Sequence, residues 1–199
     1  MSYTNFETKE IHCKVIFFGS PLAGKSANLQ SIMHNLSEEL KSGSYILESS
    51  TNKQPFFEFL PISMGEVEGY HLKLHLYTPP RLLEDSILRS VFLRGIDGYV
   101  FVADSSPEAL MLNVENIKST NSLLIEGGHN PAALPHVLQY NKRDLAEPMP
   151  ISLLRQSLNS FRAPDIEAVA TKSIGTMDCL ELIAKQIIDR LMIPQAKQP

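Results

Sequence analysis

The stretch IHCKVIFFGSPLAGKSANLQ, residues 11–30, decides the fold of this chain. A β-branched and aromatic run over residues 12–19 predicts a strand that stops at Gly19, and apolar residues at helical spacing predict a helix over 26–40. Between them, GSPLAGKS matches the phosphate-loop pattern G-x-x-x-x-G-K-[S/T], which requires a strand before it and a helix after it. A chance glycine-rich turn is the competing interpretation, and the predicted flanks disfavour it.

The residues of this loop predict how phosphate would be bound. Glycines 19 and 24 let the backbone curl with its N–H groups inward, beside the positive helix N-terminus. Lys25 is placed to reach the β and γ phosphates, and the Ser26 hydroxyl to bind Mg²⁺. The predicted nucleotide contacts in this segment are Gly19, Ser20, Leu22, Ala23, Gly24, Lys25, Ser26 and Ala27.

The rest of the chain alternates between strands and helices. Strands are predicted over 55–62, 70–77, 98–104, 135–142 and near 166–170; helices are predicted over 83–94, from 105 to the glycines at 127–128, over 152–161 and over 176–192, and 41–54 reads as a loop. The order predicts an α/β fold, a three-layer sandwich with helices on both faces of a mostly parallel sheet. Only 55–62 and 70–77 are joined too closely for a crossover, so that pair should be antiparallel.

Length and composition favour one soluble domain. The 199 residues predict a single domain, with 193–199 as a flexible tail, and 43% hydrophobic residues suffice for a core. A net charge of −4 gives no basic surface for nucleic acid or anionic lipid. No membrane span, signal peptide or lipidation motif is evident, and two distant cysteines fit a reducing compartment. We therefore expect a cytoplasmic protein, monomeric alone, that reaches membranes only through partners.

The tetrapeptide NKRD, residues 141–144, follows the predicted central strand PHVLQY. A carboxylate at Asp144 would accept two hydrogen bonds from guanine, from N1–H and from the exocyclic amine, and adenine does not offer that pair. Leaving the carboxylate unpaired would be costly, so the residue would select guanine. The Lys142 stem would cover one face of the base, and Asn141 would tie this loop to the phosphate loop. A solvated turn is the alternative.

Together the two motifs make the chain resemble a Ras-like small GTPase, a P-loop NTPase. The segments IHCKVIFFG, FFEFLP, HLYTPP, GIDGYVFVADS and LQYNKRDL are similar more narrowly to MglA, the family of bacterial gliding-motility and polarity GTPases. The resemblance covers residues 5–190. It implies GTP and GDP as ligands with Mg²⁺, a switch that recruits polarity effectors at a cell pole, and a roadblock-type, MglB-like regulator that activates hydrolysis.

Two further functions remain open from the sequence. One is a scaffold that stays GTP-loaded and binds partners without cycling. The other is a metabolic P-loop kinase or ATPase, against which the NKRD segment and the lack of an arginine-rich lid both count. Nucleotide competition separates the kinase from the switch, and partner binding to GDP-loaded and GTP-loaded protein separates the switch from the scaffold.

Two segments match the wider family pattern less well. In AVATKSIG, the resemblance aligns Ala170 with the alanine whose N–H meets guanine O6, and Thr171 with a lysine of many relatives, for which Lys172 would substitute. In the first switch, STNKQ, Thr51 offers the only threonine hydroxyl, whereas the family's threonine position falls on Gln54. Residues 52–54 read equally well as solvated loop.

The second switch departs from the family sequence T-x-P-G-Q. Thr78 and Pro80 match, but Arg81 replaces the glycine and Leu82 replaces the glutamine. Glycine lets the backbone approach the γ-phosphate without a Cβ, and the glutamine amide orients the attacking water. Because leucine has no polar side-chain atom, the resemblance implies very slow intrinsic hydrolysis.

A second catalytic group is also replaced. The family's intrinsic arginine aligns with Lys53, which lacks the planar fork of a guanidinium. An arginine finger is worth roughly 10³–10⁵ in rate. Arg81 is an alternative finger from within the chain, and Leu82 with Leu83 either face a partner or form the first turn of the helix that follows.

Overall fold

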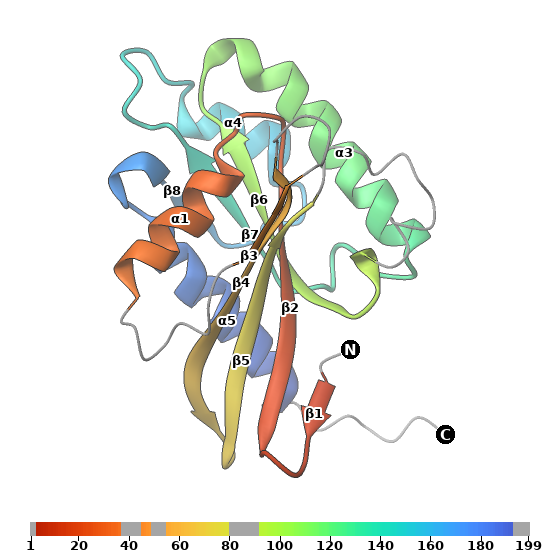
Figure 1. Ribbon diagram of the computed structural model, residues 1–199. Helices are drawn as coiled ribbons and strands as arrows, with labels where there is room; N and C mark the ends of the chain where they lie inside the picture. The colour runs from red at the N-terminus through yellow and green to blue at the C-terminus, as the bar shows by residue number, and fades with distance from the viewer. Residues whose placement is uncertain (1–2, 37–44, 49–54, 80–91, 193–199) are drawn as a thin grey trace.

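The structure is a computed structural model that describes residues 3–36, 45–48, 55–79 and 92–192. Within these residues one mixed sheet runs through the centre of the molecule, with helices against both of its faces (Figure 1). The predicted α/β three-layer sandwich is therefore confirmed.

The sheet has the strand order β3-β4-β5-β2-β6-β7-β8. Strand β2 lies between β5 and β6 and is parallel to both, and the pairs β6–β7 and β7–β8 are also parallel. The described strands are β1 (Tyr3–Asn5), β2 (Glu10–Phe18), β3 (Tyr45–Glu48), β4 (Pro55–Val67), β5 (Tyr70–Thr78), β6 (Ile96–Asp104), β7 (His136–Asn141) and β8 (Asp165–Glu167). Since parallel strands end at one edge, the loops after β2, β6, β7 and β8 meet there.

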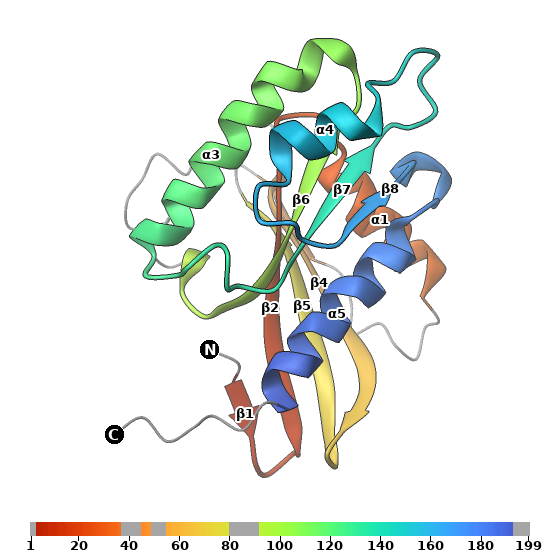
Figure 2. The ribbon, with the colours of Figure 1, turned by 180° about the vertical axis from the view of Figure 1, so that it is seen from behind.

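Four α-helices are described, and they divide between the two faces of the sheet. Helices α1 (Lys25–Asn35) and α5 (Thr176–Met192) share one hydrophobic cluster with alternate residues of β2, β5 and β6. Helices α3 (Leu110–Glu126) and α4 (Ile151–Leu158) lie on the opposite face (Figures 1 and 2). Their buried residues belong to the other cluster. Alternation along β6 explains the division, because Val100 and Val102 lie in the first cluster while Phe101 and Ala103 lie in the second.

The antiparallel pairing of β4 with β5 is confirmed, and the structure adds two antiparallel pairings that the sequence analysis did not foresee. Strand β1 pairs with the start of β2, and β3 pairs with β4, so part of the predicted loop 41–54 is an edge strand. Strand β4 also runs to Val67, beyond the predicted end at 62. The turn is confined to Glu68 and Gly69, both with positive φ.

The remaining boundaries shift by a few residues. The 3-10 turn η2 (Pro107–Ala109) leads into α3, and α4 ends at Leu158 rather than 161. The last strand is Asp165–Glu167, and the predicted strand end falls in the 3-10 turn η3 (Ala170–Lys172). The predicted helix 83–94 lies outside the described residues up to residue 91, and the predicted tail 193–199 lies outside them entirely.

Candidate nucleotide site

The predicted phosphate loop joins the end of β2 to the start of α1, as the motif requires. Gly19 has φ 138°, and a Cβ added there would overlap the carbonyl oxygen of Val102 on β6. Gly24 has φ 105°, and a Cβ there would overlap the side-chain amide nitrogen of Asn141. Two independent features therefore favour glycine at both positions. The positive φ disfavours other residues, and a neighbouring atom leaves no space for a Cβ.

The motif lysine lies across its own loop. Lys25 Nζ donates to the carbonyl oxygens of Gly19, at 2.9 Å, and of Ser20, at 2.8 Å. Leu22, with φ 62°, is 86% exposed at the loop tip, whereas Ala23 is buried beneath it. Ser26 and Ala27 form the half-buried first turn of α1. The loop therefore holds the Lys25 ammonium against its own backbone, and α1 begins at the same residue.

Asn141 joins three segments that are far apart in the sequence. Its side-chain Nδ2 donates to the Ala23 carbonyl oxygen at 2.8 Å, and its Oδ1 accepts from the Ala170 N–H at 2.9 Å. The residue is only 3% exposed. One buried amide thus holds the phosphate loop, the end of β7 and the start of η3 in a fixed arrangement.

Asp144 and η3 lie next to each other. Lys172 Nζ is 2.9 Å from Asp144 Oδ2, and this hydrogen bond holds the pKa of the Asp144 carboxyl below its usual value. Lys172 therefore lies beside the predicted guanine carboxylate. The Ala170 N–H, which the resemblance assigns to guanine O6, donates to Asn141 Oδ1 at 2.9 Å. Thr171, the next residue, is exposed.

Several polar residues that the sequence analysis missed support these loops from within. Asn28 on α1 and Gln139 on β7 are fully buried and exchange two amide hydrogen bonds of 2.7 Å each. Ser31, also on α1, lies 2.7 Å from the Thr176 hydroxyl and donates to Ser173 at 3.0 Å. The sequence does contain a sign of such residues, because Gln139 is a polar residue inside the otherwise apolar strand PHVLQY.

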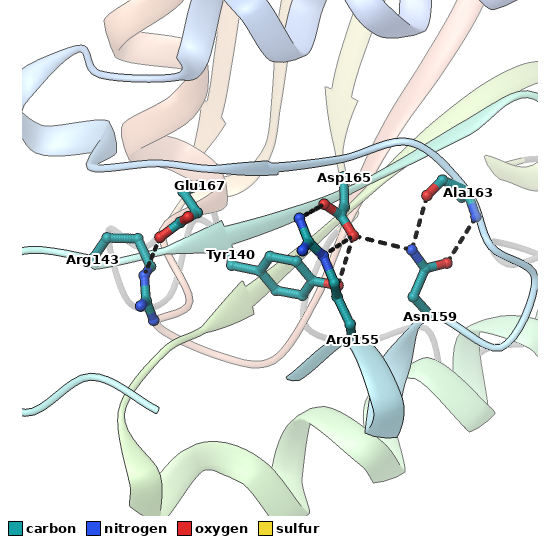
Figure 3. A network of polar contacts seen from close by, with 7 residues as sticks. All are labelled: Tyr140, Arg143, Arg155, Asn159, Ala163, Asp165 and Glu167. Carbon is teal, nitrogen blue, oxygen red and sulfur yellow. Dashed lines mark hydrogen bonds and ion pairs between the residues drawn. The ribbon is translucent and has the colours of Figure 1, made fainter. Parts of the chain in front are cut away.

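A second polar network joins helix α4 to strands β7 and β8 (Figure 3). Arg155 on α4 donates two hydrogen bonds to Asp165, of 2.8 and 2.7 Å. Asn159 binds both the N–H and the carbonyl oxygen of Ala163, at 2.8 Å, and so ends α4. Tyr140 also reaches Asp165, at 3.4 Å. The network attaches α4 to the start of β8.

Arg143, inside the NKRD segment, contacts β8 and the loop that precedes α4. Its Nε donates to Glu167 at 2.9 Å (Figure 3). Its Nη1 donates to the Met149 carbonyl oxygen at 2.7 Å. Its backbone N–H donates to the Ala168 carbonyl oxygen at 3.1 Å. The variable position of the motif therefore anchors this loop to β8.

Most of the predicted switch residues lie outside the described part of the chain. Thr78 is buried at the end of β5, next to the phosphate-loop strand. Thr51, Lys53, Gln54, Arg81 and Leu82 lie outside the described residues. Those residues that are described contain no group of three or more potential metal-ligating side chains, and none of their helices is long and apolar enough to cross a membrane.

No family model matches the chain. The chain is 38% identical over 191 residues to the mutual gliding-motility protein MglA of Myxococcus xanthus (strain DK1622), and the alignment covers 96% of this chain and 98% of that protein.

Proposed function

The chain belongs to the MglA family, and on that premise we propose that it is a cytoplasmic guanine-nucleotide switch that regulates cell polarity or motility. The observation that carries the proposal is the pair of hydrogen bonds made by Asn141, which links the phosphate loop to both loops of the predicted base pocket. A ligand that occupies both halves of such a site has a phosphate chain at one end and a base at the other.

In this proposal each loop contacts one part of GTP or GDP. Backbone N–H groups of the phosphate loop and Lys25 bind the phosphates. Asp144 accepts from the guanine N1–H and exocyclic amine, and the Lys142 stem covers the base. Because Asn141 occupies the Ala170 N–H, the Thr171 N–H is the better donor for guanine O6, and Lys172 then takes the position of the family's lysine.

Magnesium fits the same site through the nucleotide. The Ser26 hydroxyl in the first turn of α1 is a ligand type that Mg²⁺ accepts beside phosphate oxygens and water. Bound there, the metal would neutralise charge on the β and γ phosphates.

The partners proposed are those of a polarity switch. A roadblock-type, MglB-like regulator would act on the nucleotide cycle, and polarity effectors would bind the GTP-loaded protein and recruit it to a cell pole. The test is binding of candidate partners to protein loaded with GDP or with a non-hydrolysable GTP analogue. A preference for the GTP form supports the switch, whereas equal binding to both forms contradicts it.

Equal binding would instead support the second candidate, a GTP-loaded scaffold. The observation that favours this candidate is the replacement of two catalytic groups, since Leu82 stands at the water-orienting glutamine and Lys53 at the intrinsic arginine. In both candidates we propose that the protein alone hydrolyses GTP very slowly.

Single-turnover hydrolysis by purified protein tests this proposal. Wild type should be far slower than ordinary small GTPases, and Leu82→Gln should be faster if the missing amide is limiting. Arg81→Ala tests whether that arginine acts as a finger from within the chain, because a lower rate would assign it that role. Ordinary intrinsic turnover by the wild type without any partner would refute slow hydrolysis.

A further inference from the structure

Lys142, the predicted base-covering residue, is held by an ion pair with Asp104. Its Nζ lies 2.6 Å from Asp104 Oδ2, in an ion pair whose lysine side chain is 36% exposed and whose aspartate side chain is 12% exposed. Asp104 ends β6 and faces Asn141, the neighbour of Lys142, across the β6–β7 ladder. The pair therefore joins the carboxyl ends of two adjacent strands at the predicted nucleotide edge.

The aspartate is itself fixed from several directions. Its Oδ1 accepts the Ser106 N–H at 2.9 Å. Asn113 on α3, which is fully buried, accepts the Asp104 N–H at 3.2 Å and donates to the Asp104 carbonyl oxygen at 2.8 Å. The Ser20 hydroxyl of the phosphate loop donates to the same Asn113 oxygen at 3.2 Å. Asp104 thus has little freedom to follow a moving lysine.

The carboxylate is charged at neutral pH. Burial raises the pKa of Asp104, but the hydrogen bonds from Lys142 and Ser106 outweigh it, and the resulting pKa lies below the usual value. A charged, immobile acceptor is the kind of partner that holds an ammonium in one place.

We propose that Asp104 is a positioning residue that holds the Lys142 stem in the orientation needed to cover the base. A lysine side chain has four rotatable bonds, and a ligand that must order them loses affinity. With its ammonium tethered, the stem is already ordered when the nucleotide arrives. Asn113 binds both the Asp104 backbone and the Ser20 hydroxyl, so one buried side chain supports the base-covering lysine and the phosphate loop. The inference rests on the guanine-nucleotide site proposed above.

The test is the dissociation rate of fluorescent GDP from wild type, Asp104→Asn, Lys142→Met and the double variant. Asparagine retains an acceptor for the Ser106 N–H and removes the charge that holds Lys142. We expect GDP to leave roughly tenfold faster from Asp104→Asn, as befits the loss of one charge-assisted hydrogen bond. If Asp104 acts through Lys142, adding Asp104→Asn to Lys142→Met should change the rate less than twofold.

The matched control is Asp165→Asn. That carboxylate is 11% exposed and ion-paired to Arg155, yet it lies at the start of β8 rather than at the nucleotide edge. Its GDP dissociation rate should equal that of the wild type. If Asp104→Asn does not fold, Asp104→Glu replaces it in the same cycle, because it keeps the charge and displaces the carboxylate by one methylene.

Three outcomes overturn the inference. They are an unchanged rate in the Asp104 variant, an equal acceleration in the Lys142→Met background, and an equal effect of Asp165→Asn. Each requires that the wild type binds GDP. A wild type that binds no guanine nucleotide refutes the proposed function instead, so the two failures are distinguishable.

Discussion

Replacing Asn141 with alanine should separate the phosphate loop from the base loops. The change removes two hydrogen bonds, of 2.8 and 2.9 Å, and leaves the Ala23 carbonyl oxygen and the Ala170 N–H without that partner. A buried polar group left unpaired costs about 1–3 kcal/mol, so the sum is about 2–6 kcal/mol. The truncated side chain leaves space in which water can bridge the two groups, so we expect the low end, about 2 kcal/mol.

Two assays report the effect. Denaturant unfolding without nucleotide should show a free energy of unfolding lower by about 2 kcal/mol. The GDP dissociation constant should rise roughly 30-fold if the loops lose their fixed arrangement by the same free energy. Asn116→Ala is the control, because its amide donates only to the Leu112 carbonyl oxygen one turn back on the exposed side of α3. It should change stability by less than about 0.5 kcal/mol.

The reasoning is refuted if Asn141→Ala matches Asn116→Ala in both assays. A loss of stability with unchanged GDP affinity would show that Asn141 supports the fold and not the ligand site.

Three further predictions follow from single residues. Gly24→Ala should lower GDP affinity at least tenfold, since its φ of 105° and the neighbouring amide of Asn141 leave no room for a methyl group; a titration that matches the wild type contradicts this. His136 is buried and stacked on Tyr99, and burial lowers its pKa, so the unfolded state binds its proton first and stability should fall as pH drops below about 6.5. Unfolding of His136→Phe should show a flatter pH profile, and an equal slope would exclude the histidine as the cause. Burial raises the pKa of the Cys179 thiol to about 12, so mass spectrometry at pH 8 should find it unlabelled by a thiol reagent in the native protein; rapid labelling would contradict its burial.

Local patterns were enough to predict the parts of the site that depend on the backbone. A strand, a turn with glycines and a helix are specified by neighbours in sequence, so β2, a turn with positive φ at Gly19 and Gly24, and α1 follow one another as predicted for the segment Gly19–Ser26 and its flanks. The antiparallel β4–β5 pair was also predictable, because a short connection admits no crossover.

Contacts between distant residues were not predictable from one sequence. The local sequence SSPEALMLN does not predict that Asn113 binds both backbone groups of Asp104 and the Ser20 hydroxyl. The edge strand β3 has a local signal, the run YIL within Tyr45–Glu48, but the run is short and lies between polar residues, and the strand depends on β4 for its hydrogen bonds. The Ala170 N–H was assigned by resemblance to the base, whereas folding gives it to Asn141.

The most direct test of the central claim compares dissociation constants of GDP and ADP for nucleotide-free wild type and Asp144→Asn. Calorimetry should show that the wild type binds GDP far more tightly than ADP, and that the variant loses most of this discrimination, because its amide no longer accepts both guanine donors. Wild-type protein that binds ADP as tightly as GDP, or binds neither, would contradict the account.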